Sequence, residues 1–179
     1  NNNPITITNS NHRFLVKDQF RSLKKGYGEI FLEPSSKNTA PAILAATLFQ
    51  HNIDQNSSLL MLPTDHVIPN KLAFHEMIIR GYKDIENGNL IIFGIKPTEP
   101  NPGYGYINVK IKKNFVAYPI NEFIEKPSLK RATNMLHEGN YLWNSGIILF
   151  KSKDLIRTFK ELQPDIFKEV SFSLKKGQR

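Results

Sequence analysis

A carboxylate at the end of an apolar run is the first feature of this sequence that could do chemistry. Residues 59–68 read LLMLPTDHVI, so a strand-like run stops at a proline and then presents Asp65 and His66. A carboxylate just past a buried strand is a hard oxygen ligand, suited to a Mg²⁺ ion that also contacts substrate phosphates. The alternative is a turn-forming aspartate. For His66 we expect a partly buried, hydrogen-bonding side chain rather than a metal ligand or a base.

A second charged pair follows another short apolar run. FIEKP at 123–127 ends with Glu125 and Lys126 before a proline. Glu125 could accept hydrogen bonds from sugar hydroxyls while the Lys126 ammonium holds a phosphate as a point charge. The pair would therefore suit a phosphorylated carbohydrate, although adjacent Glu and Lys are also common on protein surfaces.

Three further motifs could contact a ligand through backbone or amide groups. GYGYI contains Gly105, whose backbone a ligand could approach closely, and a tight turn into a hairpin explains the motif as well. NTAPA at 38–42 places backbone N–H groups at a helix start, where they could bind a base edge or an anion, or only form a cap. Asn144 interrupts an apolar strand, so a buried Asn144 must hydrogen-bond to backbone or to a ligand.

The elements between these motifs alternate, which predicts an α/β fold with a mostly parallel sheet. Strands are predicted at 4–8, 29–32, 59–62, 90–95, 123–127 and 141–150. Helices are predicted at 11–25, 38–51, 70–88, 128–139, 152–163 and after Pro164, with N-caps at Asn38 or Thr39, Asn70 and Ser128. Residues 97–114 are rich in turn formers and then alternate, as a small β-ribbon would. Ligands of such sheets bind beyond the carboxyl ends of the strands, where Asp65 is expected.

Composition narrows the classes of protein. The chain of 179 residues is 40% hydrophobic, which suits one folded domain, and it contains no cysteine for a disulfide, a thiolate or a zinc site. No apolar stretch is long enough for a membrane helix and the first residues lack a signal-peptide pattern, so we expect a cytoplasmic protein without membrane association. The net charge of +8 is dispersed, which favours a solvated surface or attraction of small phosphorylated ligands over a nucleic-acid partner.

The order of the motifs resembles that of the nucleotidyltransferases that activate sugar phosphates, and within them the mannose-1-phosphate guanylyltransferases. The segments that carry the resemblance are EPSSKNTAPA, LPTDH, FGIKPTEPNPGYGYI, FIEKP and YLWNSGIILF. NTAPA, GYGYI and LWNSG are specific to that branch, while LPTDH and FIEKP are shared more widely in variant form. The resemblance covers nearly the whole chain and implies a Rossmann-like sheet flanked by helices, with a small β-ribbon insertion, in a single partial catalytic domain over 1–179.

The resemblance also implies roles for individual residues. Asp65 would hold the catalytic Mg²⁺ and Lys126 would bind the sugar phosphate, so these two are the implied catalytic residues. The implied base-recognition residues are Glu33, Asn38, Thr39, Ala40 and Pro41, and the implied sugar-pocket residues are Gly105, Glu125, Lys126 and Asn144. The implied reaction is in-line attack of a mannose 1-phosphate oxygen on the α-phosphorus of GTP, which gives GDP-mannose and pyrophosphate. No proton must be abstracted, because the phosphate is already ionised near neutral pH.

Two parts of the family pattern have no counterpart in these residues. The chain contains no glycine-rich loop of the kind that cradles the triphosphate, so we expect that loop to lie upstream of Asn1 or not to exist. No counterpart of the second metal-binding aspartate occurs before Arg179. We therefore expect a fragment, truncated at both ends, with little or no transferase activity alone and a sheet edge that could promote a homo-oligomer. The alternatives are a non-catalytic module that binds a sugar nucleotide or sugar phosphate, and a basic nucleic-acid binder, which the dispersed lysines disfavour.

Overall fold

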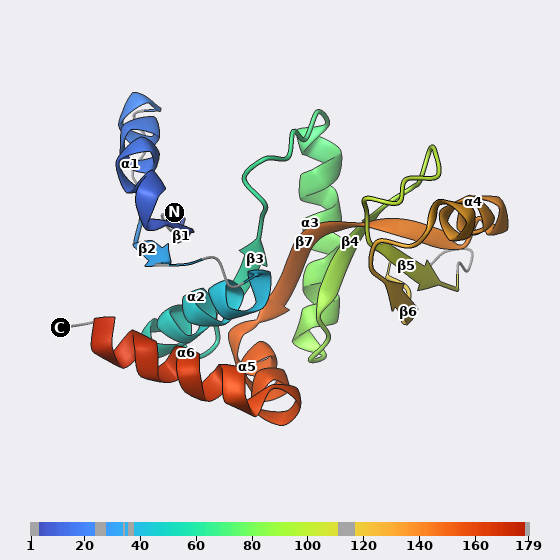
Figure 1. Ribbon diagram of the computed structural model, residues 1–179. Coiled ribbons are helices and arrows are strands. Elements are labelled where there is room, and N and C mark those ends of the chain that lie inside the picture. Colours follow the sequence, from blue (N-terminus) through green and yellow to red (C-terminus); the bar gives the residue numbers. More distant parts are fainter. Residues whose placement is uncertain (1–3, 24–27, 34, 36–37, 111–116, 178–179) are drawn as a thin grey trace. The chain divides into compact units, whose positions relative to one another are not determined.

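The structure, a computed structural model, describes residues 4–23, 28–33, 35, 38–110 and 117–177 (Figure 1). Its contacts divide the chain into two compact units. Unit 1 comprises Asn1–Ser57 and Leu155–Arg179, and unit 2 comprises Ser58–Asp154. Each unit has a sheet of its own, while a single catalytic domain over 1–179 stays a prediction.

Unit 1 combines a small parallel sheet with helices. Its elements are β1 (Thr6–Asn9), η1 (Ser10–His12), α1 (Arg13–Ser22), β2 (Ile30–Glu33), α2 (Thr39–Ile53), most of α5 (Ser152–Leu162) and α6 (Pro164–Gly177). β1 and β2 pair in parallel, and α2 lies alongside α6. Phe31 of β2 meets Phe49 of α2 edge to face, with ring centroids 5.3 Å apart. The strand–helix order of this unit therefore follows the prediction.

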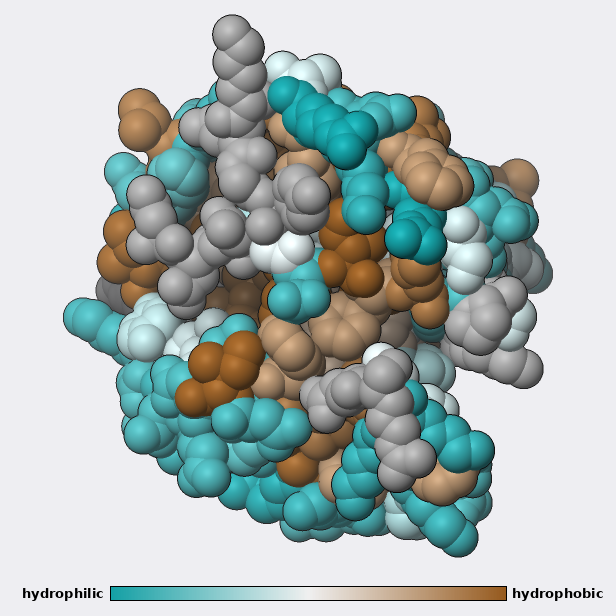
Figure 2. Space-filling view, turned by 90° about the vertical axis from the view of Figure 1, so that its left-hand side faces the viewer, coloured by the Kyte–Doolittle hydropathy of each residue, from teal (hydrophilic) through white to brown (hydrophobic). Residues whose placement is uncertain are grey.

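The surface of unit 1 carries charges of both signs. Hydrophilic side chains cover most of the lower part of the face shown in Figure 2. On α6 the exposed charged residues are Asp165, Lys168, Glu169, Lys175 and Lys176. Acidic and basic residues are thus interspersed over the first part of this helix, and positive charge gathers only in its last turn. None of the described helices is both long and apolar enough to cross a membrane.

Unit 2 is built around one long strand, β7 (Tyr141–Lys151), which runs through the middle of the unit in Figure 1. The other elements are β3 (Ser58–Met61), α3 (Lys71–Glu86), β4 (Ile91–Ile95), β5 (Tyr106–Val109), β6 (Ile120–Ile124) and α4 (Leu129–Glu138). Ile148 pairs with Met61 of β3 and with Ile92 of β4, so β7 lies between these two strands. β5 pairs with the first part of β7 and with β6.

The α/β class is confirmed, but the strand directions in unit 2 differ from the predicted mostly parallel sheet. The pairs described in this five-stranded sheet are antiparallel, and the described parallel pair is β1 with β2. β3 and β4 both run antiparallel to β7 and hence parallel to each other, as strand–helix–strand order predicts. β7, which comes much later in the sequence, takes the position between them. Local sequence pattern cannot reveal such a long-range insertion.

The predicted ribbon corresponds to the antiparallel pair β5 and β6, although residues 111–116 lie outside the described part. This pair is continuous with the rest of the sheet, because β5 also pairs with β7. One face of the three strands packs against α4. The core there contains Tyr106, Ile124, Ala132 and Met135, with Tyr141 and Trp143 packed beside them.

Two helix caps follow the prediction. The Asn70 side chain accepts a hydrogen bond from the Ala73 N–H at 3.0 Å and begins α3. Ser128 accepts one from the Arg131 N–H at 3.3 Å and begins α4, which Gly139 ends with φ 72°. A left-handed residue at this position is what glycine tolerates at a helix end.

An ion pair between a buried lysine and a half-exposed glutamate joins the end of β7 to the end of α3. The Lys151 Nζ lies 2.6 Å from Glu86 Oε1 and 5.5 Å from the centroid of the Tyr82 ring. The Tyr82 hydroxyl also accepts a hydrogen bond from Ser58 Oγ at 3.3 Å. The hydrogen bond with Glu86 raises the pKa of Lys151 above its ordinary value, more than burial lowers it. Lys151 is therefore charged at neutral pH although it is buried.

Candidate functional site

Three of the predicted sugar-pocket residues lie in one row across the sheet of unit 2. β5 pairs with β6 and β7 in a register that places Gly105 opposite Glu125 on one side and opposite Asn144 on the other. The Asn144 N–H donates a hydrogen bond to the Gly105 carbonyl at 2.8 Å. Directly opposed residues of neighbouring strands project to the same face. The structure therefore brings these three positions together.

Gly105 leaves open the space between the two side chains that flank it. A Cβ at Gly105 would stand 2.8 Å from Oε2 of Glu125, 3.0 Å from Cζ of Phe123 and 3.5 Å from Cβ of Asn144. The first distance is shorter than Cβ atoms tolerate, so any other residue would displace the carboxylate. The glycine is required here for space rather than for an unusual backbone angle.

The positions next to this row project to the opposite face. Tyr106 and Ile124 are buried in the core that α4 covers. Glu125, by contrast, is exposed. The sheet thus has a covered face beneath α4, and the row from Glu125 to Asn144 lies on the other face.

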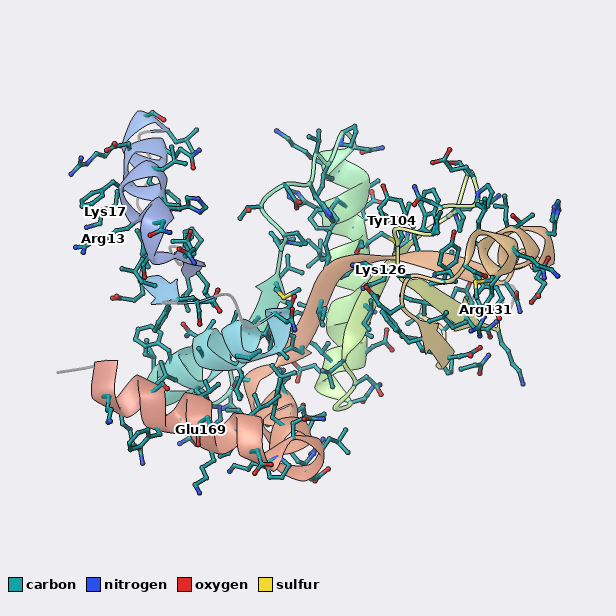
Figure 3. All side chains as sticks on the ribbon, in the orientation of Figure 1. Arg13, Lys17, Tyr104, Lys126, Arg131 and Glu169 are labelled. Carbon is teal, nitrogen blue, oxygen red and sulfur yellow. The ribbon has the colours of Figure 1, made fainter. Side chains whose placement is uncertain are left out.

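Lys126 follows Glu125 directly, in a strained backbone conformation. Its φ is 45°, in the left-handed region that residues other than glycine rarely adopt. The next two residues hold this turn, since Pro127 is buried and Ser128 caps α4. Lys126 and Tyr104 occupy the positions just beyond the row and lie at the same end of the sheet in Figure 3. Lys126 is exposed, as is Glu125, which precedes it in the chain.

Asn144 stands at the start of a bulge in β7. Ile92 pairs with Ile148 but Gly94 pairs with Asn144, so the single residue between the β4 positions faces three residues of β7. The Asn144 Oδ1 accepts a hydrogen bond from the Gly146 N–H at 3.0 Å. The backbone partner that the sequence required is thus found. The Nδ2 amide makes no hydrogen bond to the described residues, so a role in donating to a ligand stays a prediction.

Ser145 belongs to the same bulge and was missed by sequence reasoning. Its buried Oγ donates to the Phe93 carbonyl at 2.6 Å and accepts from the Ile147 N–H at 3.1 Å. A serine next to Asn144 in an otherwise apolar strand was the signal that could have revealed it.

Asp65 lies in the loop after β3, as predicted, with a side chain that is 85% exposed. Its Oδ1 lies 3.9 Å from His66 Nε2, which is too long for a hydrogen bond. The hydrogen bond expected of His66 is thus not formed within the described residues. A Cβ at Gly146 would lie 3.2 Å from Cγ of Pro63, so the LPTDH loop lies against the β7 bulge. The loop of Asp65 and the bulge of Asn144 are therefore neighbours.

The residues around Asp65 suit one mode of metal binding. Within the described ranges, no group of three or more His, Cys, Asp or Glu side chains is placed to hold a metal ion. Mg²⁺ at phosphate-handling sites is held by one or two carboxylates, with substrate phosphates and water as the other ligands. A single exposed carboxylate fits that mode and not a metal cage made only of protein groups. Mg²⁺ binding by Asp65 stays a prediction.

The predicted base-recognition residues lie in unit 1. Glu33 ends β2, and its carbonyl accepts a hydrogen bond from Ser10 Oγ at 3.1 Å. Asn38 occupies the N-cap position of α2 but makes no capping hydrogen bond through its side chain, so the cap was predicted correctly in position and wrongly in contact. Its φ of 65° and ψ of −176° fall in a region that is nearly restricted to glycine. Thr39, Ala40 and Pro41 form the first turn of α2, with Pro41 there as predicted.

Comparison with known proteins identifies the family. The profile described as nucleotidyl transferase matches residues 1–179. The chain belongs to the nucleotidyl transferase family. It is 41% identical over 177 residues to a mannose-1-phosphate guanylyltransferase of Salmonella montevideo, covering 96% of this chain and 37% of that protein. It is 39% identical over 178 residues to one of Escherichia coli, covering 96% and 38%. The predicted resemblance is confirmed, and the chain spans little more than a third of the length of these relatives.

Two solved structures share the fold of this chain over nearly its whole length. The structure described as mannose-6-phosphate isomerase from Helicobacter pylori matches with a TM-score of 0.85 and 29% identity, covering 97% of this chain and 65% of that chain. The structure described as mannose-1-phosphate geranyltransferase from Thermus thermophilus matches with a TM-score of 0.81 and 25% identity, covering 96% and 49%. The roles of individual residues in this nucleotidyl transferase chain stay predictions.

Proposed function

We propose that the protein transfers a guanylyl group from GTP to mannose 1-phosphate, with Mg²⁺, and forms GDP-mannose and pyrophosphate in the cytoplasm. The observation that carries the proposal is the row of Gly105, Glu125 and Asn144 beside Lys126, in a chain about 40% identical to mannose-1-phosphate guanylyltransferases. The choice of guanine and mannose rests on the names of these relatives.

The row offers complementary groups to a sugar. The Glu125 carboxylate only accepts hydrogen bonds, whereas the Nδ2 amide of Asn144 donates. Sugar hydroxyls do both, so one hydroxyl can donate to Glu125 while another accepts from Asn144. Gly105 between them lets the ring approach the backbone. This set of groups supports hexose binding over this face of the sheet.

The phosphates require positive charge and alignment. Lys126 would hold the phosphate of mannose 1-phosphate. The strained turn sets the backbone position from which this side chain extends. Asp65 would hold Mg²⁺, which when bound would offset the negative charge of the reacting phosphates. Since the attacking oxygen is already ionised, the side chains must align two anions and weaken their repulsion. At the helix start in unit 1, the side-chain amide of Asn38 makes no capping hydrogen bond and could bind the base.

Titration calorimetry of the chain with mannose 1-phosphate, GTP and GDP-mannose in Mg²⁺ tests this function. We expect GDP-mannose to bind, and Glu125→Gln to weaken binding by at least about tenfold because charged hydrogen bonds to hydroxyls are lost. Glu122→Gln is the matched control, since Glu122 lies in β6, three residues before Glu125, and pairs with Arg131. Equal binding of UDP-glucose would contradict the assigned base and hexose, and absence of binding by any sugar nucleotide would overturn the proposal.

A further inference from the structure

A side chain bridges the two strands at the bulge in β7. At this point Phe93 alone faces Ser145, Gly146 and Ile147. The Phe93 carbonyl and the Ile147 N–H both turn to the Ser145 hydroxyl, at 2.6 and 3.1 Å. Ser145 is only 5% exposed, so water cannot easily replace it. One buried hydroxyl therefore links β4 to the bulged segment of β7.

The same bulge adjoins two parts of the candidate site in unit 2, namely Asn144 and the loop that carries Asp65. Asn144 immediately precedes Ser145, and its Oδ1 accepts from the Gly146 N–H at 3.0 Å. Gly146 has φ 71°, and it lies against Pro63 in the loop that carries Asp65. A change in the bulge would therefore alter the direction of the Asn144 amide and the surface on which the Asp65 loop rests.

We propose that Ser145 is a positioning residue, which fixes the bulge so that Nδ2 of Asn144 points to the bound sugar. Ser145 does not itself touch the ligand. The inference rests on the proposed function, because it assigns the sugar-binding role to Asn144. It extends that function by naming the group, the Ser145 hydroxyl, that fixes the orientation of Asn144 in the proposed sugar pocket.

Replacing the hydroxyl tests this role. Ser145→Ala removes both hydrogen bonds, and we expect affinity for mannose 1-phosphate and for GDP-mannose to fall by about tenfold or more. Ser145→Thr keeps the Oγ atom and should recover most of the affinity. If the alanine variant does not fold, Ser145→Cys replaces it, and its weakly bonding thiol should give an intermediate affinity.

Thr47→Ala is the matched control. Thr47 is fully buried in α2, and its Oγ1 donates to the Ile43 carbonyl at 2.7 Å. The alanine variant therefore loses a hydroxyl-to-carbonyl hydrogen bond of the same kind as Ser145→Ala does. We expect this variant to change the midpoint of thermal unfolding without changing sugar-phosphate affinity. Nuclear magnetic resonance adds a readout that needs no ligand. In Ser145→Ala, the side-chain amide signals of Asn144 should shift and the Ile147 amide should exchange faster, and in Thr47→Ala neither should change.

The outcomes separate this inference from the proposed function. If the wild-type chain binds sugar phosphate and Ser145→Ala binds it equally well, Ser145 has no positioning role. If Ser145→Ala and Thr47→Ala lose affinity alike, the effect is general destabilisation and the inference fails. If the wild-type chain binds no sugar ligand, the proposed function fails. The resonance comparison then still decides whether Ser145 holds Asn144, and unchanged Asn144 signals would overturn that claim.

Discussion

The position of the Glu125 carboxylate depends on the missing side chain of Gly105. In Gly105→Ala the new Cβ would displace Oε2, which it would otherwise approach to 2.8 Å. The displaced atom is the end of a flexible side chain, so we expect a loss of less than about 1 kcal/mol in unfolding free energy. Affinity for GDP-mannose should nevertheless fall by at least about tenfold. Urea unfolding and calorimetry measure the two effects.

Gly139→Ala is the control for this variant and should show the reverse pattern. Gly139 has φ 72° and nothing within 4 Å of its would-be Cβ, so the alanine is strained but displaces no side chain. We expect a loss of about 1 kcal/mol in stability and unchanged affinity. Wild-type affinity in Gly105→Ala would show that the carboxylate is not placed by this contact.

Lys126 combines a strained backbone conformation with the phosphate-binding role that we propose for it. Its φ of 45° is one that glycine adopts freely, so Lys126→Gly should unfold at the same free energy as the wild type or up to about 1 kcal/mol higher. The same change removes the ammonium group and should lower affinity for mannose 1-phosphate by at least about tenfold. Lys126→Ala, which keeps the strained backbone conformation, should lower the affinity for mannose 1-phosphate without raising the unfolding free energy. A Lys126→Gly chain less stable than Lys126→Ala would contradict this account.

At the scale of elements, the ion pair of Lys151 and Glu86 joins β7 to α3. Because the pKa of Lys151 is raised on folding, its stabilising contribution is fully present below the ordinary lysine value near 10.5. It is lost as the pH rises through the higher folded-state pKa. Glu86→Gln should cost about 1–2 kcal/mol at pH 8, since Glu86 is half exposed.

The difference between the wild type and Glu86→Gln should therefore shrink above about pH 10.5. Urea unfolding of both chains over this range measures it, and the comparison removes the titration of the other lysines and tyrosines. A difference that stays constant to the highest pH would show that the carboxylate does not control the charge of Lys151.

Most elements could be predicted from sequence because their signals are local. Asn70, Ser128 and Gly139 mark helix ends through hydrogen bonds or backbone angles that involve residues a few positions away. The place of β7 between β3 and β4 could not be predicted in this way, because pairing partners such as Ser58 and Lys151 lie far apart in the chain. The strand itself was predicted correctly and its neighbours were not.

In the candidate site, too, the residues that belong to local motifs could be predicted and a residue that acts through a long-range contact could not. Gly105, Glu125 and Asn144 were predicted through motifs that resemble a family, and the strand register then places them side by side. Ser145 was missed because its role depends on Phe93, which pairs across the sheet with a later strand. A residue that acts through a long-range contact leaves little trace in its local sequence.

At the scale of the whole molecule, ligand binding should be visible as stability. A ligand that binds only the folded chain raises its unfolding free energy, by about 2.7 kcal/mol at a hundred times Kd. We expect GDP-mannose to raise the midpoint of thermal unfolding in Mg²⁺, and EDTA or Asp65→Ala to remove most of that rise. Asp18→Ala, which removes an exposed carboxylate in unit 1, should leave the rise in the unfolding midpoint unchanged. An equal rise with and without the metal would contradict the role of Asp65.

Unit 2 begins and ends at neighbouring backbone positions. Ser58, its first residue, pairs with Lys151, close to its last residue Asp154. The first and last residues of the unit are therefore close together in space. Domains with neighbouring ends tolerate insertion and exchange of segments. Replacing residues 58–154 by the equivalent stretch of a relative would need only two adjacent joins. Under the sugar site that we propose in unit 2, exchanging this one segment should transfer the preference for a sugar phosphate from one family member to another.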